Sequence, residues 1–234
     1  NGCKSNSSKS RKISTLHSFF KFLHTKAKVI DSDPTLELEK PKISSRQPVH
    51  LSLSEARGLL NAVEGDFKER DYCILTLFLN CGMRLSELVN INLSNIKGDT
   101  LTVIGKGNKE RTVYLNDACM KALRDYLVVR PTEDIKDKDA LFISKRKQRI
   151  SNKSVQHIVK KYLEKAGLDT KKYSVHKLRH TAATLMYQHG DVDIRALQQI
   201  LGHSNISTTQ IYTHVDNKTL REAVRRNPLA KEVV

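Results

Sequence analysis

Apolar residues recur at helical spacing along most of this chain, and the spacing changes to a strand pattern in one stretch, DTLTVIGKGNKERTVYL. Two β-rich runs, 101–104 and 112–115, flank a turn that is rich in glycine and lysine. Such a pattern predicts a β-hairpin. The stretch ALFIS at 140–144 is a candidate for one more short strand. The predicted fold class is therefore α+β, mainly α with a small antiparallel β-sheet.

Capping residues help to delimit the helical segments. Ser52 or Ser54 is a suitable N-cap for the helix in 51–63, and Gly82 is suited to end a strongly apolar helix. Helical spacing predicts helices at 9–24, 51–63, 66–82, 84–91, 117–129, 152–166, 175–189, 193–201, 208–214 and 218–225.

The segment 31–50, DSDPTLELEKPKISSRQPVH, contains three prolines and no hydrophobic period, so it is predicted to be an interdomain linker. The single amphipathic helix before it cannot form a domain alone. We therefore expect residues 1–30 to be the end of a preceding domain, or an arm, in a chain that is a fragment. The main domain is predicted at 51–216, and a C-terminal helix or tail at 217–234.

The charge balance of the chain predicts a polyanionic partner. Its 234 residues include 41 Lys and Arg against 25 Asp and Glu, which gives a formal net charge of +16. Nucleic acid is the usual partner of such a protein. A membrane partner is not expected, because no apolar run approaches the roughly 20 residues that span a bilayer and no amphipathic stretch sets its cations opposite a bare apolar face.

The four cysteines, Cys3, Cys73, Cys81 and Cys119, are scattered without a C-x-x-C pair. A disulfide framework or a cysteine zinc site is not expected, and Cys73 and Cys81 lie in an apolar helical run as small core residues. This usage fits a reducing cytoplasm. The polar, basic N-terminus gives no sign of a secretory signal.

Two clusters of cations are candidates for anion binding. Arg84 in CGMRLSEL stands at a predicted helix start, and Glu87, on the same helix face, can hold its guanidinium. In IGKGNKER, Lys106, Lys109 and Arg111 occupy a hairpin tip whose glycines let the backbone approach a ligand. An ordinary surface ion pair and a solvated turn are the alternatives.

Two further stretches contain histidine and tyrosine. In HKLRHTAATLM, His176, Arg179 and His180 share one helix face. Two histidines four residues apart can bind zinc, but the cation between them and the lack of a nearby acidic ligand favour an anion site. In LGHSNISTTQIYTHVD, His203 follows a helix end and Tyr212 lies on a short predicted helix. Tyr212 is a core aromatic, a neighbour of a metal site or a nucleophile.

The segments CGMRLSEL, VIGKGNKERTVYL, HKLRHTAATLM and LGHSNISTTQIYTH, in this order and roughly this spacing, resemble the catalytic domain of tyrosine recombinases. This family includes the Xer recombinases and the integrases of phages and conjugative transposons. The resemblance covers about residues 50–216, and it is specific because all segments occur in order. It also implies that residues 1–30 hold the last helix of a core-binding domain.

The resemblance implies DNA cleavage without a metal or another cofactor. The implied catalytic residues are Arg84, Lys106, His176, Arg179, His203 and Tyr212. Tyr212 would attack a scissile phosphate, expel the 5′-hydroxyl and leave a 3′-phosphotyrosyl bond. The two arginines would stabilise charge on the non-bridging oxygens, because Arg offers bidentate donors that Lys cannot copy.

Other roles follow from the same resemblance. Lys106 is the candidate general acid for the leaving oxygen. His176 and His203 would donate hydrogen bonds to the phosphate, and His176 is also a candidate acceptor of the tyrosine proton. Glu87 would support the site, and His180 matches a position that mainly supports structure.

The expected partners are double-stranded DNA with a specific recombination site and other copies of this chain, in a tetramer on DNA in the bacterial cytoplasm, associated with the nucleoid. The candidate DNA contacts are Lys109, Arg111, Lys153 and Lys160. For the helix at 152–166 a solvated basic face is the alternative to a groove-reading face. The tail residues expected to pack in trans on a neighbouring protomer are Leu220, Val224, Leu229 and Val233.

The sequence favours integration or excision of a mobile element, with Xer-type resolution of chromosome or plasmid dimers as the alternative role. A type I topoisomerase that relaxes DNA uses the same residue types and is a rival enzyme class. A decayed, non-catalytic integrase is disfavoured because the full set of catalytic residue types is present. A zinc protein with histidine ligands is not expected, because no acidic or cysteine ligands lie near the histidines.

Overall fold

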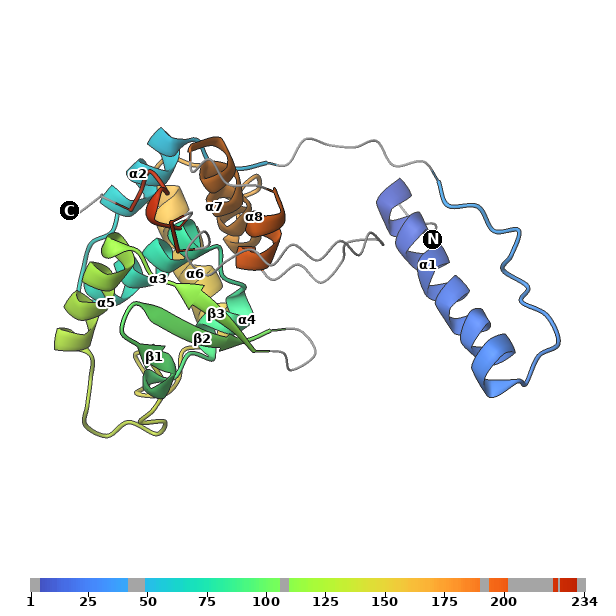
Figure 1. Cartoon of the computed structure of the whole chain (residues 1–234), viewed down its shortest axis with the longest axis horizontal. Coiled ribbons are helices and arrows are strands. Elements are labelled where there is room, and N and C mark those ends of the chain that lie inside the picture. Colours follow the sequence, from blue (N-terminus) through green and yellow to red (C-terminus); the bar gives the residue numbers. More distant parts are fainter. Residues whose placement is uncertain are drawn as a thin grey trace. The chain divides into compact units, whose positions relative to one another are not determined.

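The computed structural model describes residues 5–41, 49–105, 110–189, 194–201, 221–222 and 224–230 (Figure 1). The chain divides into two compact units, Asn1–Gln47 and Pro48–Val234. Four of the predicted site residues lie outside the described residues: Lys106, Lys109, His203 and Tyr212. The helix predicted at 208–214, half of the one at 218–225, and Cys3, Leu220 and Val233 also lie outside them.

The first unit contains one long helix, α1 (Asn6–Phe22), which continues into the π-helical turn η1 (Leu23–Ala27). Ser5 caps α1, because its hydroxyl accepts a hydrogen bond from the amide of Ser8. Lys28 has φ +53° and ends the turn in a left-handed conformation. No residue of α1 is buried, and Phe19 and Phe22 are more than half exposed. The predicted helix is present, and its apolar side chains have no core within the described part of this unit.

The second unit begins with three helices whose ends follow from capping. Ser52 and Glu55 form a capping box at the start of α2 (Leu53–Asn61). Helix α3 (Lys68–Cys81) ends at Gly82, which adopts φ +59°. The chain then turns into α4 (Leu85–Val89), for which Arg84 is the N-cap residue. The Ser52 cap and the glycine end of α3 confirm the sequence prediction.

A three-stranded antiparallel sheet follows, in the order β1–β2–β3. The predicted hairpin is β2 (Thr100–Ile104) with β3 (Glu110–Tyr114), in a register that pairs Leu101 with Val113. The sequence did not predict β1 (Ile96–Lys97), which pairs with β2 after the 3₁₀ turn η2 (Leu93–Asn95).

The strand proposed at 140–144 is wrong. This stretch forms only two isolated bridges, Asn92 with Ala140 and Ile143 with Arg149. Side chains bind part of its backbone, since Arg130 donates hydrogen bonds to the carbonyls of Ala140 and Leu141 at 2.6 and 3.0 Å.

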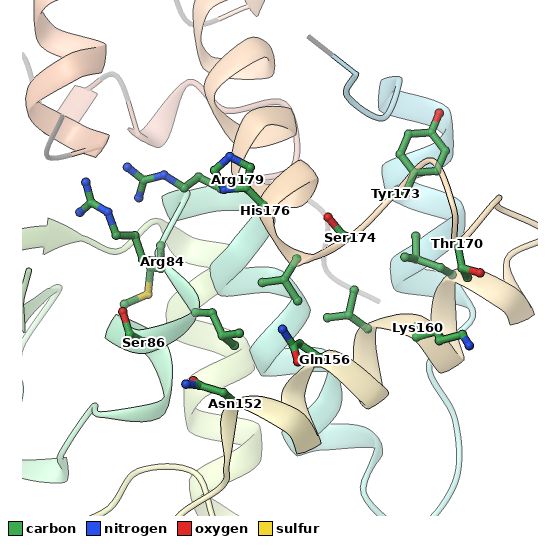
Figure 2. A pocket seen from close by; sticks show the side chains of 15 residues that line it. Arg84, Ser86, Asn152, Gln156, Lys160, Thr170, Tyr173, Ser174, His176 and Arg179 are labelled. Atoms are coloured by element: carbon green, nitrogen blue, oxygen red, sulfur yellow. The ribbon is translucent and has the colours of Figure 1, made fainter. Parts of the chain in front are cut away.

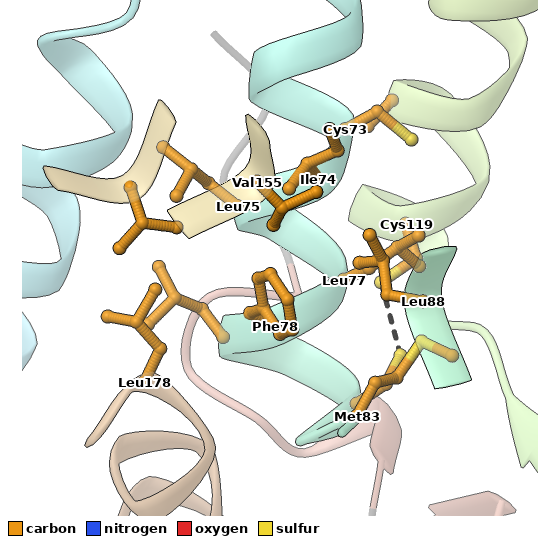
Figure 3. Close-up of a cluster of buried hydrophobic side chains, with 14 of the residues drawn as sticks. Cys73, Ile74, Leu75, Leu77, Phe78, Met83, Leu88, Cys119, Val155 and Leu178 are labelled. Carbon is orange, nitrogen blue, oxygen red and sulfur yellow. Dashed lines mark hydrogen bonds between the residues drawn. The ribbon is translucent and has the colours of Figure 1, made fainter. Parts of the chain in front are cut away.

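Four further helices complete the described unit: α5 (Asp117–Val129), α6 (Asn152–Lys165), α7 (Val175–His189) and α8 (Ile194–Leu201). Helix α3 runs through their centre, and every residue from Cys73 to Cys81 is buried. Figure 3 shows its side chains beside Val155 of α6, Leu178 of α7 and Cys119 of α5. Cys73, Cys81 and Cys119 are free, buried thiols, which confirms Cys73 and Cys81 as core residues.

Two of the C-terminal residues expected to pack on a neighbouring protomer are buried against their own chain in this structure. Leu229 is fully buried in the main core of the unit, and Val224 is buried in a second cluster beside Ala182 and Ile200. Asn227 donates a hydrogen bond to the carbonyl of Leu79 at 3.1 Å, which attaches this segment to α3. Both apolar residues are therefore used within their own chain. Among the described helices, none is long and apolar enough to cross a membrane.

Candidate active site

The centre of the candidate site is the carboxylate of Glu87 in α4, whose side chain is completely inaccessible to solvent. The backbone amide of Arg84 donates to Glu87 Oε2 at 2.7 Å, and the Arg84 guanidinium donates to Oε1 at 2.7 Å. The predicted pairing of Arg84 with Glu87 is therefore present. Because the carboxylate is buried, the pair is not an ordinary surface ion pair.

Two more guanidinium groups approach the same carboxylate from other elements. Arg111 of β3 donates to Glu87 through Nη2 at 2.8 Å and through Nε at 3.3 Å. Arg179 of α7 places Nη1 4.0 Å from Glu87 Oε2. The fold thus gathers three arginines from three segments around one buried acid.

Burial alone would raise the pKa of Glu87, but hydrogen bonds and charge from Arg111, together with hydrogen bonds from Arg84, outweigh it and hold the pKa below its usual value. Burial also lowers the pKa of Arg179 to about 10, with a smaller contribution from the like charge of Arg84. Arg179 is still a cation at pH 7. The site therefore combines an ionised acid with arginines in partly desolvated surroundings.

Backbone carbonyls fix the orientation of Arg179. Its Nη1 donates to the carbonyl of Gly82 at 2.7 Å, and its Nη2 donates to the carbonyl of Leu201 at 2.5 Å. Gly82 suits this turn, since its φ is +59° and an added Cβ would lie 2.7 Å from Leu201 Cδ2, so the Leu201 side chain would have to move. The turn after α3 and the end of α8 together position this guanidinium.

His176 and His180 lie one turn apart on α7, with their Nε2 atoms 3.1 Å apart. The pKa of His176 is lowered by burial and, to a smaller extent, by the charges of Arg179 and Lys177. The imidazole is therefore neutral at pH 7 and can accept a proton. Within the described part of the chain, no group of three His, Cys, Asp or Glu side chains could hold a metal ion.

A pocket of about 690 Å³ opens beside these residues, between α4, α6 and α7. Figure 2 shows the side chains of Arg84, Arg179 and His176 gathered at one end of it. The α6 residues Asn152, Gln156 and Lys160, spaced four apart, line the opposite wall. Asn152 was not singled out from the sequence, although its spacing from Gln156 and Lys160 on one helix face was a usable signal.

The described candidates for DNA contacts differ in their surroundings. Lys160 lines the pocket and is mostly exposed, 3.7 Å from Glu164. Lys153 lines a separate hollow of about 550 Å³ that also includes Lys145 and Arg149. Arg111 departs from its prediction, since its side chain is only 13% exposed and its guanidinium is bonded inward to Glu87.

Comparison with known proteins shows that residues 50–219 match the family described as the phage integrase family. The chain belongs to this family. It is similar to tyrosine recombinase XerC of Caldanaerobacter subterraneus subsp. tengcongensis, with 66% identity over 224 residues, covering 96% of this chain and 64% of the relative. Tyrosine recombinase XerC of Thermodesulfovibrio yellowstonii is 40% identical over 239 residues, covering 98% of this chain and 78% of that protein. The chain thus spans less than two thirds of the first relative's length.

Solved structures support the same assignment. The crystal structure of XerA recombinase is 33% identical, with a TM-score of 0.61 over 88% of this chain and 80% of that one. A post-cleavage complex of XerH recombinase with its palindromic difH substrate has a TM-score of 0.70 over 94% of this chain and 67% of that one, and at 24% identity it supports the fold alone. The predicted fold class and the resemblance to Xer-like tyrosine recombinases are confirmed.

Proposed function

We propose that this chain carries the catalytic domain of a site-specific DNA recombinase that cleaves and rejoins strands through a covalent 3′-phosphotyrosyl intermediate. The observation that supports this most directly is the pair Arg84 and Arg179, which are held around Glu87 at the wall of one pocket. Two fixed guanidiniums suit a phosphate whose non-bridging oxygens gain charge in the transition state.

The proposed step balances without a cofactor. A bond forms between the Tyr212 oxygen and phosphorus as the bond from phosphorus to the 5′-oxygen breaks. The tyrosine proton passes to His176, and Lys106 gives a proton to the leaving 5′-oxygen. The roles of Tyr212, Lys106 and His203 come from the family resemblance, because these residues lie outside the described part of the chain.

The proposed substrate is double-stranded DNA, with α6 facing a groove. Asn152, Gln156 and Lys160 of α6 share the pocket with the arginines, which supports a helix that contacts DNA next to the reacting phosphate. Similar structures include recombinases whose complexes with DNA were solved. We further propose that residues 1–30 belong to a core-binding domain, that 31–50 link it to the catalytic domain at 51–216, and that the protein acts as a tetramer on DNA.

Covalent capture on DNA tests the proposal. Duplexes that carry a nick beside a randomised segment are incubated with the protein, and those retained as SDS-resistant complexes are selected and sequenced. We expect wild-type protein to select one site, Tyr212→Phe to retain nothing, and EDTA to have no effect. Retention by Tyr212→Phe would exclude the proposed nucleophile, and failure of wild-type protein to retain any duplex would contradict the function.

The selected site also separates the biological roles. We propose integration or excision of a mobile element, and the similarity to XerC proteins keeps dimer resolution as the alternative. Joining of the selected site to a different partner sequence would support integration. Exchange only between two identical sites would support resolution, and relaxation of supercoils without joining would support a topoisomerase.

A further inference from the structure

Arg111 has contacts that neither the catalytic residues nor the predicted DNA contacts explain. It is the second residue of β3, and two of its nitrogens donate to the buried carboxylate of Glu87. Its third nitrogen, Nη1, donates to the carbonyl of Ile200 in α8. One side chain thus joins the sheet, α4 and α8.

Arg111 changes the net charge that the groups around Glu87 present to the pocket. Arg84 and Arg179 line the pocket, whereas Arg111 and Glu87 are not among its lining residues. Three guanidiniums and one carboxylate leave two net positive charges, which can act on a phosphate in the pocket. Without Arg111, the buried carboxylate would cancel one of the two charges that face the pocket.

The bond to Ile200 concerns the last turn of α8. The final carbonyls of a helix lack partners within the helix and carry partial negative charge, so cations stabilise them. Here Arg111 binds the carbonyl of Ile200 while Arg179 binds that of Leu201. Leu201 directly precedes the segment that contains His203 and Tyr212.

We propose that Arg111 is a positioning residue for DNA cleavage, which neutralises Glu87 from outside the pocket and fixes the end of α8 ahead of the nucleophile segment. This inference rests on the proposed function. It replaces the DNA contact predicted for Arg111.

Cleavage and binding separate the two roles. Under single-turnover conditions with the selected nicked duplex, we expect Arg111→Met to slow cleavage by about 10- to 100-fold, the range known for the loss of hydrogen-bond partners that orient metal ligands. The salt dependence of DNA affinity should change less than it does when an exposed phosphate contact is lost, because Arg111 faces Glu87 and does not line the pocket. The control Lys153→Ala, an exposed candidate contact, should reduce the slope of log K against log salt by about 0.9. An equal loss of slope in Arg111→Met, or a wild-type cleavage rate, would overturn the proposal.

A double variant tests the neutralisation itself. In Arg111→Met/Glu87→Gln no buried negative charge remains, so we expect it to cleave faster than Arg111→Met, although Met cannot restore the bond to Ile200. Arg111→Lys should remain slow, since one ammonium cannot replace three directed donors. A double variant as slow as Arg111→Met would overturn the role. If the unneutralised charge of Glu87 prevents Arg111→Met from folding, the double variant, which lacks this charge, should fold. A double variant that also fails to fold would overturn the role.

A second measurement needs no DNA. Among the described side chains, Arg84 and Arg179 are the cations that still face Glu87 in Arg111→Met. Because burial is the largest influence on this carboxyl, we expect its pKa to rise in the variant. A carboxyl whose pKa is raised by folding stabilises the fold when protonated, so stability falls as the pH rises. Relative to wild type, the urea midpoint of Arg111→Met should increase from pH 7 to pH 5, and adding Glu87→Gln should abolish this gain. A pH dependence equal to that of wild type would contradict the proposal, whatever the outcome of the covalent capture experiment.

Discussion

At the residue scale, the site depends on one acid that holds arginines from distant parts of the chain. The pairing of Arg84 with Glu87 was predictable, because three residues on a helix bring two side chains to one face. The bonds from Arg111 and Arg179 to this region were not, since nothing local in the sequence records which strand or helix will pack against α4. The inward orientation of Arg111 is therefore a property of the tertiary structure.

Replacing Arg84 by lysine should separate charge from geometry. Lysine keeps the positive charge but cannot bind Glu87 and a phosphate through one planar group. We expect Arg84→Lys to slow single-turnover cleavage of the selected duplex by about 10²–10³-fold, with little change in the urea midpoint. The control is Arg124→Lys on an exposed position of α5. Equal rates for both variants would show that Arg84 supplies charge alone.

The pH dependence of cleavage should report His176. Because burial, Arg179 and Lys177 lower its pKa, the imidazole stays neutral to a pH below the ordinary histidine value of 6.5. If His176 acts as the base, it must be neutral, so cleavage should continue until the pH falls below 6.5. Lys177→Ala removes one of the lowering charges, so the acid limb of the rate profile should move to higher pH, whereas Lys177→Arg should leave it in place. If neither substitution moves the acid limb, the limb reports the titration of a group other than His176.

At the scale of the elements, the long periodic helices and the hairpin were predictable, whereas the two-residue strand β1 and the structure of 140–144 were not. Helices α5 and α7 begin and end at the predicted residues, because both have a sustained apolar face. Strand β1 has two residues, too few for any alternation to appear. The stretch 140–144 has the composition of a strand, but the Arg130 side chain satisfies two of its carbonyls.

The turn between α3 and α4 is the element on which the site depends most closely. Gly82→Ala should cost about 1–2 kcal/mol of stability for the left-handed backbone and also displace Leu201, whose carbonyl holds Arg179. The matched control is Gly167→Ala, with φ +70° and no atom within 4 Å of an added Cβ. Urea denaturation should show comparable or larger losses for Gly82→Ala, and cleavage should fall only in that variant. Full activity of folded Gly82→Ala would disprove the coupling to Leu201.

At the scale of the whole molecule, the sequence could not distinguish burial within one chain from burial between chains. Val224 and Leu229 have the apolar pattern of an anchor for a neighbouring protomer, and both are buried in their own unit. An amphipathic segment reports only that one face needs a cover. Whether this face packs on its own chain or on a neighbouring protomer depends on the path of the residues that connect it to the core. The hydrophobic period does not contain this information.

Truncations divide the tail into two parts. Removing residues 227–234 takes away Leu229 and the bond from Asn227 to Leu79, so we expect a loss of unfolding free energy of at least about 2–4 kcal/mol. Removing only 231–234 leaves the contacts of Leu229 and Asn227 in place, so the urea midpoint should fall less than after removal of 227–234. Weaker cooperative complexes of this shorter truncation in mobility-shift assays would support trans packing. Leu229→Ala in the full chain is the control for the first effect. An unchanged free energy of unfolding after removal of 227–234 would show that this segment does not stabilise the hydrophobic core.

The carbonyl-held guanidinium of Arg179 has a thermodynamic consequence. Folding removes this cation from water and places it near the like charge of Arg84, and both effects lower the pKa of Arg179, so burying its charge carries a free-energy cost. An anion in the pocket relieves it. In the proposed complex with DNA, binding would therefore also stabilise the junction of α3, α4, α7 and α8.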